Sequence, residues 1–510
     1  MFQVDLLERD VLGVLSIVRS TMNTFASINR IPPEVLALIA HHRNADKSLR
    51  TLTHVCRRWR EIFVSHASLW TGLDCETINK TRLFLERSKT SPLRIRTKGR
   101  FLNDAFLLTV PHLDRLESLS FSWSSTSLLQ FIEHLGSPSP LLKTLSLIVT
   151  HGERPVLRDS IFGGTLSSLR ELRLGGVITN LAWGNMTNLR LFGLSDVPAE
   201  KRSTTRLLDF FERAPLLREI LLENMVPDSS DAPPGRIVPL PNLAELAIDS
   251  EQPHTTLMNH LLIPTGASIN QTVHLSDASS LILSHLPNDF KNLKHLSIIT
   301  SVTLSFASPV HFRFEGPSGG HRIFGKWAPW SSPHSSFGRQ VLESLDVLSV
   351  SAVERLTIEH WQFTPSPTAV AISTSPICPI YPFFHLMDNL RALTLTACLN
   401  HPFLFALNPK KNAPRIVICP KLKELVVHIG EKERYFTNRL LAMAKERASR
   451  GARLAVVAII DVNKLLTATR VLELRTYVTR VDYRRENIMP NSNATPRVVD
   501  LTSDESDWWP

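Results

Sequence analysis

The sequence predicts an α/β protein in which a small helical module near the amino terminus precedes an irregular solenoid with parallel strands. Two observations carry this prediction. The first is a pair of amphipathic helical segments within residues 29–73, and the second is a leucine-rich frame that recurs from about residue 110 onward. Within each copy of the frame the apolar spacing changes from helical to strand-like, which is typical of repeats that stack their strands in parallel.

Length and composition fit a globular chain with more than one structural unit. The 510 residues are 43% hydrophobic and 20% charged, which is ordinary for folded domains. The patterns divide the chain into an N-terminal helical extension (1–28), the helical module (29–73), a basic connector (74–108), a repeat region (109–487) with loop excursions near 315–337 and 364–382, and a flexible tail (488–510).

The sequence favours an intracellular protein, in the cytoplasm, the nucleus or both. The apolar run at residues 11–18 is bracketed by Asp10 and Arg19 and is far shorter than the about 20 residues of a membrane span. Asp5 and Glu8 lie where a signal peptide is positive. The five cysteines are odd in number and include no CxxC pair, which predicts reduced thiols, no disulfide framework and no zinc site.

The first helix of the module is expected to be capped by Asn29. Pro32 and Pro33 would occupy its first positions, where a missing N–H costs nothing, and Glu34 would lie in its positive first turn. A second periodic run predicts one longer helix with a buried stripe of seven side chains: Leu49, Leu52, Val55, Cys56, Trp59, Ile62 and Phe63. A hairpin of about 40 residues buries little core by itself, so it should pack on a partner or on the rest of the chain.

These segments resemble the F-box, the module by which substrate receptors dock onto the Skp-family adaptor of cullin-based ubiquitin ligases. The resemblance is carried by the strings INRIPPEVLALI, LRTLTHVCRRWREI and SLWTGL, in that order. Residues 84–93 are also similar to fungal F-box-like proteins. The alternative is an amphipathic hairpin that packs only on its own domain.

The resemblance implies a set of adaptor-binding residues, which are Ile31, Pro32, Leu36, Ile39, Leu52, Val55, Trp59, Leu69 and Trp70. Within this set, Ile31, Pro32, Leu36 and Ile39 are expected to face the adaptor. Leu52, Val55 and Trp59 are expected to be shared between the hairpin core and the interface, with Trp59 mainly a core residue.

From about residue 110, four apolar positions recur at spacings of three, three and two residues. The cleanest copy is Leu166, Leu169, Leu172 and Leu174. Further copies begin at Leu113, Met186, Leu240, Phe290, Met387 and Cys419. A helical end that turns into a short strand is the pattern of a leucine-rich repeat, and the steps of 20 to 28 residues between successive copies up to residue 248 lie in the range of such repeats.

The repeats are predicted to be irregular. The positions that would hold a stabilising asparagine ladder are Ser124, Thr150, Val177, Val197, Met225 and Glu251. Helices are expected at residues 127–135 and 204–214, on the outer side of the arc. An unrelated α/β domain with leucine-rich helices is the alternative.

The frame is interrupted after residue 298. Alternating runs at 302–306, 310–314 and 321–327 predict strands, with a hairpin at the glycine-rich turn 316–320. Near the end, a helix with the stripe Phe436, Leu440, Met443 and Ala444 is expected to stop at Gly451 and to precede a buried strand at 454–460.

The sequence predicts no catalytic, cofactor-binding or metal-binding residues. Residues 316–320 match the GxSxG spelling of a hydrolase elbow around Ser318, but a strand rather than a helix follows, and Pro317 fixes the backbone. Residues 320–326 approach a phosphate loop, yet Trp327 stands where Ser or Thr must bind magnesium. An esterase built on Ser318 is the enzymatic alternative.

The predicted function is a substrate receptor without enzymatic activity, whose partners are the Skp-family adaptor, through it a cullin, and an unknown target protein. The main alternative is a leucine-rich-repeat scaffold or nucleic-acid-associated protein without a ligase role. Residues 80–100 carry eight basic residues against Glu86 alone, a net +7, which can attract phosphates or an acidic protein. No aromatic interleaving or nucleic-acid-reading motif accompanies them, so neither nucleic acid nor a membrane is the predicted partner.

Overall fold

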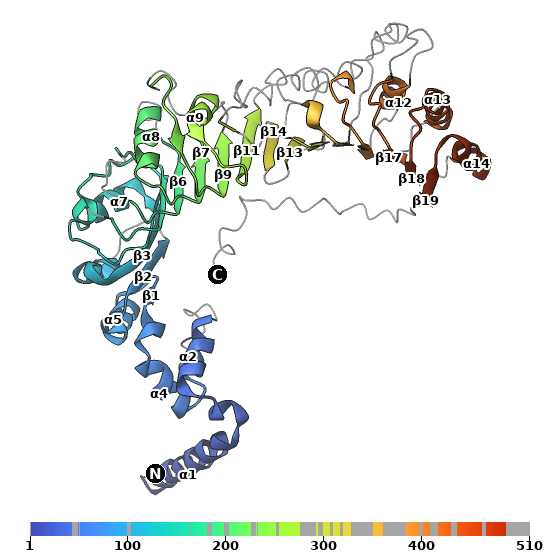
Figure 1. Ribbon diagram of the computed structural model, residues 1–510. Helices are drawn as coiled ribbons and strands as arrows, with labels where there is room; N and C mark the ends of the chain where they lie inside the picture. Colours follow the sequence, from blue (N-terminus) through green and yellow to red (C-terminus); the bar gives the residue numbers. More distant parts are fainter. Residues whose placement is uncertain are drawn as a thin grey trace. The chain divides into compact units, whose positions relative to one another are not determined.

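A computed structural model gives the fold of the chain (Figure 1). It describes residues 2–42, 49, 51–98, 104–164, 166–180, 186–197, 203–225, 231, 233–250, 254–275, 292–293, 299–305, 310–316, 320–327, 350–360, 384–396, 401–408, 417–429, 436–461 and 466–485. The chain forms two compact units. The first comprises Met1–Thr272 with His285–Lys294, and the second comprises Val273–Ser284 with His295–Pro510.

The first unit begins with helices. In order, these are α1 (Phe2–Phe25), the 3-10 turn η1 (Ser27–Arg30), α2 (Pro33–His42), α4 (Arg57–Ser65), the 3-10 turn η2 (Ala67–Trp70) and, after a short strand β1 (Gly72–Leu73), α5 (Ile78–Ser88). None of the described helices combines the length and the hydropathy that crossing a bilayer requires.

Two expectations for the helical module are corrected. Asn29 does not cap α2, because it lies inside η1 and its side chain is used elsewhere. The second helix is not continuous: residues 51–53 are helical, His54 and Val55 form a turn, and Cys56 is extended at φ −157° and ψ 172° before α4 begins. The Thr- and Val-rich run 51–55 has low helix propensity, which accounts for the break.

Parallel strands follow the helices in the first unit. Their order is β1, β2 (Leu93–Lys98), β3 (Leu116–Ser124), β4 (Thr144–His151), β5 (Glu171–Gly175), β6 (Leu191–Ser195), β7 (Glu219–Glu223) and β9 (Glu245–Ser250), each paired in parallel with the next. β2 lies within the segment predicted as a basic connector. The basic residues of that segment are therefore held partly on a strand.

Short helices and turns connect these strands. They are α6 (Asp104–Leu107), η3 (Val110–Arg115), α7 (Ser125–Ile132), η4 (Ile161–Gly164), α8 (Thr204–Glu212) and α9 (Thr255–Asn259), with the small strand pair β8 (Val238–Pro239) and β10 (Leu261–Leu262). The helices predicted at 127–135 and 204–214 are confirmed as α7 and α8. Helix α7 begins two residues before and ends three residues before its predicted range, and α8 ends two residues early. β11 (Ser268–Leu275) begins beside β9, since the Ser268 N–H donates to the Ala244 carbonyl at 2.8 Å.

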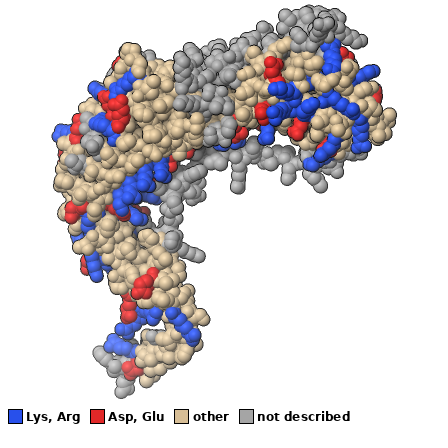
Figure 2. All heavy atoms as spheres, viewed as in Figure 1, with Lys and Arg blue, Asp and Glu red and all other residues tan. Residues whose placement is uncertain are grey.

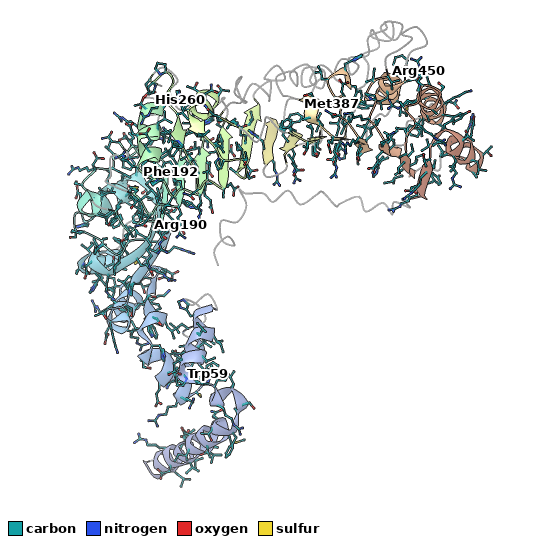
Figure 3. All side chains as sticks on the ribbon, viewed as in Figure 1. Trp59, Arg190, Phe192, His260, Met387 and Arg450 are labelled. Atoms are coloured by element: carbon teal, nitrogen blue, oxygen red, sulfur yellow. The ribbon has the colours of Figure 1, made fainter. Side chains whose placement is uncertain are left out.

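The recurring apolar positions form the core of the first unit. The third position of each copy lies in register with the next, in the row Leu119, Leu145, Leu172, Phe192, Ile220 and Leu246. All six side chains are fully buried, and Phe192 is labelled in Figure 3. The strand-like end of the frame thus buries one face of the parallel strands, as the spacing predicts.

Asparagine side chains link successive copies, at a position of the repeat other than the one that would hold an asparagine ladder. Each donates its Nδ2 hydrogens to a main-chain carbonyl of the preceding copy: Asn188 to Ser167 (2.9 Å), Asn242 to Pro215 (3.0 Å), Asn292 to Asn259 (2.7 Å) and Asn389 to Ser351 (2.7 Å). Each asparagine directly precedes the second leucine of the frame. These bonds satisfy carbonyl groups that the short strands leave without a ladder partner.

The second unit contains strands in the order β14, β13, β12, β15, β16, β17, β18 and β19. Their bounds are β12 (Ser301–Ser305), β13 (Val310–Glu315), β14 (Gly320–Trp327), β15 (Arg355–Glu359), β16 (Ala392–Thr396), β17 (Glu424–Ile429), β18 (Val456–Asp461) and β19 (Arg480–Arg485). β13 is antiparallel to β12 and β14, so the predicted hairpin is confirmed. From β12 through β15 to β19 the pairing is parallel. Ser318 and residues 361–383 lie outside the described residues.

Helices α12 (His401–Leu407), α13 (Phe436–Ser449) and α14 (Ala468–Tyr477) and the turn η9 (Val350–Ala352) complete the second unit. The predicted stripe of α13 is buried, and Gly451 adopts φ 77° just after the helix, as a terminating glycine does. Arg447 is fully buried and donates to the carbonyls of Ile418 (2.8 Å) and Cys419 (2.9 Å). These two hydrogen bonds hold α13 against the turn that precedes β17. Met387 and Arg450, labelled in Figure 3, lie in the same unit.

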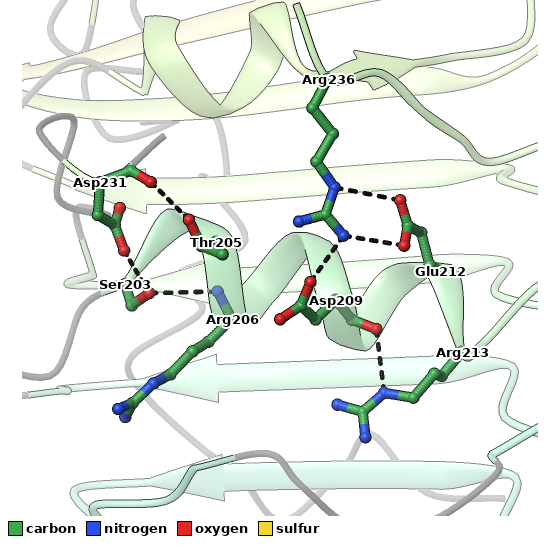
Figure 4. A network of polar contacts seen from close by, with 8 residues as sticks. All are labelled: Ser203, Thr205, Arg206, Asp209, Glu212, Arg213, Asp231 and Arg236. Carbon is green, nitrogen blue, oxygen red and sulfur yellow. Dashed lines mark hydrogen bonds and ion pairs between the residues drawn. The ribbon is translucent and has the colours of Figure 1, made fainter. Parts of the chain in front are cut away.

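A polar network holds α8 to the chain that follows β7 (Figure 4). Arg236 donates to Asp209 at 2.7 Å and to Glu212 at 2.8 Å on the helix. Asp231 accepts the Thr204 N–H at 3.0 Å and is hydrogen-bonded to the Ser203 hydroxyl at the first turn of the helix. The carboxylate therefore supplements the cap that Ser203 provides to the Arg206 N–H.

Asp231→Ala is expected to lower the free energy of unfolding by about 1 kcal/mol, because it leaves a helix N–H group without its acceptor. Asp231→Asn keeps an acceptor oxygen without the charge and should lose less. Denaturant unfolding of both variants measures the difference. Equal stability of Asp231→Ala and the parent would show that water replaces the carboxylate without cost.

Candidate functional site

Helix α2 carries apolar side chains on two opposite faces. Leu36, Ala37 and Ala40 are buried against the rest of the first unit, with Leu36 only 1% exposed. Val35, Leu38 and Ile39 lie on the other face, and Leu38 and Ile39 are 56% and 48% exposed. We call these three residues the α2 ridge. Three large apolar side chains at the i, i+3 and i+4 positions of one helix form a continuous apolar surface.

The structure divides the nine predicted adaptor-binding residues into three groups by exposure. Buried are Leu36, Leu69 and Trp70; partly exposed are Ile31, Leu52 and Trp59; exposed are Pro32, Ile39 and Val55. The expectation that Leu36 faces outward is corrected, because it lies on the inner face of α2. Val35 and Leu38 were missed by the sequence reasoning, although their spacing from Ile39 is the signal that identifies them.

Trp59 joins α4 to the start of the module (Figure 3). Its Nε1 donates to Asn29 Oδ1 at 2.7 Å, and Asn29 Nδ2 in turn donates to the Asn23 carbonyl at the end of α1. The Trp59 ring contacts Phe63 edge-on, with ring centroids 5.5 Å apart. Arg58 adds a hydrogen bond of 3.2 Å to the Ile31 carbonyl. These contacts fix the segment from which α2 starts.

Trp70 joins the module to the helix that follows it. Its Nε1 donates to the Phe63 carbonyl at 2.8 Å, its ring meets Phe84 of α5 edge-on at 5.0 Å, and the Arg87 guanidinium lies 4.3 Å from the ring centroid. Aromatic and cation–π contacts of this kind stabilise a buried tryptophan beyond its burial alone. The buried Trp70 thus anchors the module to α5 and is not part of its exposed surface.

The described cysteines differ in access. Cys56 is half-buried, whereas Cys75 and Cys419 are buried, and all three are free thiols. Burial raises the pKa of Cys75 to about 12, and the nearby Asp74 carboxylate adds to the shift. Burial also raises the pKa of Cys419 to about 12. A raised pKa leaves these two thiols protonated and unreactive at neutral pH.

Iodoacetamide is therefore expected to alkylate Cys56 of the native protein well before Cys75 or Cys419 at pH 8. Since the thiolate is the nucleophile and it forms only as the pH approaches the raised pKa, reaction at the buried sites should stay slow until unfolding. Peptide mass spectrometry of native and denatured samples measures all three sites. Fast alkylation of Cys75 in the native state would contradict its placement.

A row of basic side chains follows one edge of the first unit's strands. Lys143, Arg170, Arg190 and Arg218 each directly precede the strands β4, β5, β6 and β7, and the Arg190 N–H donates to the Arg170 carbonyl. Lys143 is paired with Glu117 at 2.7 Å, but no ion pair among the described residues engages the three arginines. Lys and Arg side chains gather over these strands in Figure 2, and Arg190 is labelled in Figure 3. Adjacent strands lie about 4.8 Å apart, so the row can meet successive anionic groups of a partner.

The α2 ridge and the basic row offer different kinds of contact to another molecule. Within the ranges that the structure describes, no group of three or more His, Cys, Asp or Glu side chains could hold a metal ion. The α2 ridge offers apolar contact, and the basic row offers charge. Each is a surface for another molecule to cover.

Comparison with known proteins bears on the helical module. No curated protein matches the chain. The family model described as F-box-like matches residues 28–76. The matched segment runs from η1 through α2, α4 and η2 to just beyond β1, and it includes the α2 ridge and Trp59. Residues 28–76 of this chain are an F-box-like domain.

Proposed function

We propose that the chain is the substrate-receptor subunit of a cullin-based, SCF-type ubiquitin ligase and is not itself an enzyme. Its F-box-like domain would dock on a Skp-family adaptor, and through it on a cullin, while the region after the domain holds a target protein. The observation that carries this proposal is the exposed α2 ridge within the F-box-like domain.

The energetics of the ridge support a partner. Val35, Leu38 and Ile39 keep roughly half of their surface in water, and covering apolar surface gains about 25 cal/mol per Å². The inner face of α2 is already covered, because Leu36 and Ala40 are buried. The ridge is therefore free to serve an interface without unpacking the domain.

The region after the domain supports a repeat arc of the leucine-rich type. Three features recur from copy to copy. They are the buried apolar positions, the parallel strands in register, and the asparagine side chains that bond to the preceding copy. Repeat arcs present the solvent side of their strands as an extended binding surface. Holding a target there beside a charged ubiquitin carrier would raise the effective concentration of the reacting groups, so the receptor contributes geometry and the chemistry occurs elsewhere.

The test compares affinity purifications of the parent chain and of Leu38→Asp/Ile39→Asp. The parent should recover a Skp-family adaptor and a cullin together with target proteins. The variant should lose the adaptor and the cullin but keep the targets, because its change is confined to the ridge. Recovery of the adaptor by the variant, or its absence from the parent, would contradict the proposal.

The second candidate is a scaffold or nucleic-acid-associated protein, and the row Lys143, Arg170, Arg190 and Arg218 favours it. Such a protein would bind duplex or single-stranded probes with an affinity that falls steeply with salt. Arg170→Glu/Arg190→Glu should abolish that binding. Probe binding with this salt dependence, combined with no adaptor in the purification, would favour this candidate over the ligase role.

A further inference from the structure

The basic row of the first unit places three arginines on neighbouring strands. Main-chain hydrogen bonds join its members, since the N–H groups of Arg170, Arg190 and Arg218 each donate at 2.7 Å to the carbonyl of the preceding member. The side chains of the row are exposed, and within the described part of the chain no ion pair neutralises the three arginines. Like charges on neighbouring strands repel one another, so the row lowers the stability of the isolated chain.

The repeat itself does not require a basic residue at this position. The residue that directly precedes β9 is Ala244, and the one that directly precedes β15 in the second unit is Glu354. Their N–H groups make the same kind of main-chain hydrogen bond to the neighbouring strand, at 2.7 Å and 2.8 Å. Because the fold accommodates alanine and glutamate there, packing does not account for the arginines. An anionic partner that neutralises them does.

Carboxylates beside the row limit the kind of anion that can lie on it. One position further along the strands, Glu171, Glu219 and Glu245 lie in one register row. Glu223 and Asp249 follow at the far ends of β7 and β9. A nucleic-acid duplex is broad and carries one charge for about every 1.7 Å of its axis, so it would bring phosphates onto these carboxylates as well as onto the row.

Single-stranded nucleic acid is narrower, but the row lacks the second feature that holds it. Proteins bind single strands by combining a basic groove with aromatic side chains on which the bases stack. Strands β4, β5, β6 and β7 contain one Phe, Tyr or Trp residue, Phe192, and it is fully buried. The row therefore offers a single strand charge without a stacking surface.

An extended polypeptide with acidic side chains matches the row in size and in chemistry. Its four members lie on successive strands about 4.8 Å apart, which makes the row about 14 Å long. An extended chain covers that length in about five residues and presents alternate side chains to one face. Arginine pairs with a carboxylate through two parallel hydrogen bonds, so acidic side chains suit the three guanidinium groups.

We propose that the basic row binds an acidic segment of the target protein, an extended stretch of about five residues with Asp or Glu at alternate positions. The assignment of this segment to a target rests on the proposed receptor function, whereas the binding itself needs no adaptor. Charge complementarity of this kind selects partners and speeds their association, and it weakens as salt is raised. The row would thus select targets by their charge pattern.

Fluorescence anisotropy with a labelled peptide of alternating Glu and Ser, titrated with the full-length chain, tests the proposal. The parent should bind the peptide with an affinity that falls as salt is raised, and it should not bind the same peptide with Gln in place of Glu. Arg170→Gln/Arg190→Gln should weaken binding by at least about tenfold, because two charge-assisted contacts are lost.

The matched control is Arg154→Gln/Arg158→Gln. It removes the same charge from exposed residues of the first unit that follow the opposite end of β4, and it should bind the peptide as the parent does. Circular dichroism should show that both variants are folded like the parent, since all four arginines are exposed. No binding by the parent, or equal losses for the row variant and the control, would overturn the proposal.

DNA probes separate the two kinds of anionic partner. A single-stranded oligonucleotide with the same number of charges as the peptide, and a duplex, should both bind the parent more weakly than the peptide does. Tighter binding of either probe, lost in Arg170→Gln/Arg190→Gln, would overturn the proposal and favour the nucleic-acid candidate.

The receptor function and the acidic-segment site can fail separately. Leu38→Asp/Ile39→Asp changes only the α2 ridge, so it should bind the peptide as the parent does. Peptide binding by a parent that recovers no adaptor would contradict the receptor function and leave the site in place. An adaptor recovered by a parent that does not bind the peptide would overturn the site alone.

Discussion

Leu36→Asp is expected to unfold the F-box-like domain and, as a consequence, to abolish adaptor binding. Leu36 is 1% exposed on the inner face of α2, so the substitution buries a carboxylate without a partner and leaves a cavity. The free energy of unfolding of the domain should fall by at least about 4 kcal/mol. Hydrogen exchange localises the effect: amides of residues 28–76 should lose protection, while strands β3 to β7 keep theirs.

Ile39→Asp is the matched control on the same helix. Ile39 is 48% exposed, so the charge remains in water and the stability should change by no more than about 0.5 kcal/mol. Adaptor binding should nevertheless be lost, because the ridge is interrupted. If Leu36→Asp kept the protection of residues 28–76, or Ile39→Asp lost it, the assignment of inner and outer faces of α2 would be wrong.

Trp59→Ala is expected to lower the stability of the same domain by about 3 kcal/mol. The change removes the edge contact with Phe63 and the hydrogen bond to Asn29 Oδ1. It therefore leaves the acceptor of the buried Asn29 side chain unpaired. Thermal unfolding followed by circular dichroism measures the loss.

Trp59→Phe separates the two contributions. The phenyl ring keeps most of the contact but cannot donate, so about 1 kcal/mol should be lost through the missing hydrogen bond. Equal melting temperatures for Trp59→Ala and the parent would show that Trp59 does not hold α4 to η1.

The parts of the fold that could be predicted are those fixed by local spacing. Leu172 and Leu174 lie two residues apart at the end of a helical-period run, which specifies a short strand with one buried face. The hairpin between β13 and β14 is likewise local, since a glycine-rich turn separates two alternating runs. The alternation of Leu93 and Ile95 with Arg94 and Arg96 also specifies a strand, and β2 forms there, within the segment predicted as a basic connector from its charge.

The parts that could not be predicted depend on contacts between distant residues. Asn29 is a sound helix cap by its type, but Trp59, thirty residues later, takes its side-chain oxygen. Helix α2 is apolar on both faces, and only the packing of α4 and η2 decides that Leu36 is inside and Leu38 outside. The linking role of Asn188 also required the structure, because its acceptor is the Ser167 carbonyl of the preceding copy.

The central claim is that the α2 ridge of an F-box-like domain binds a Skp-family adaptor, and calorimetric titration of the full chain with that purified adaptor tests it most directly. The parent should bind with one adaptor per chain, and Leu38→Asp/Ile39→Asp should weaken binding by at least about 100-fold. Leu129→Asp/Leu141→Asp, which changes two comparably exposed leucines outside the domain, should bind as the parent does. No heat of binding from the parent, or equal binding by the ridge variant, would contradict the account.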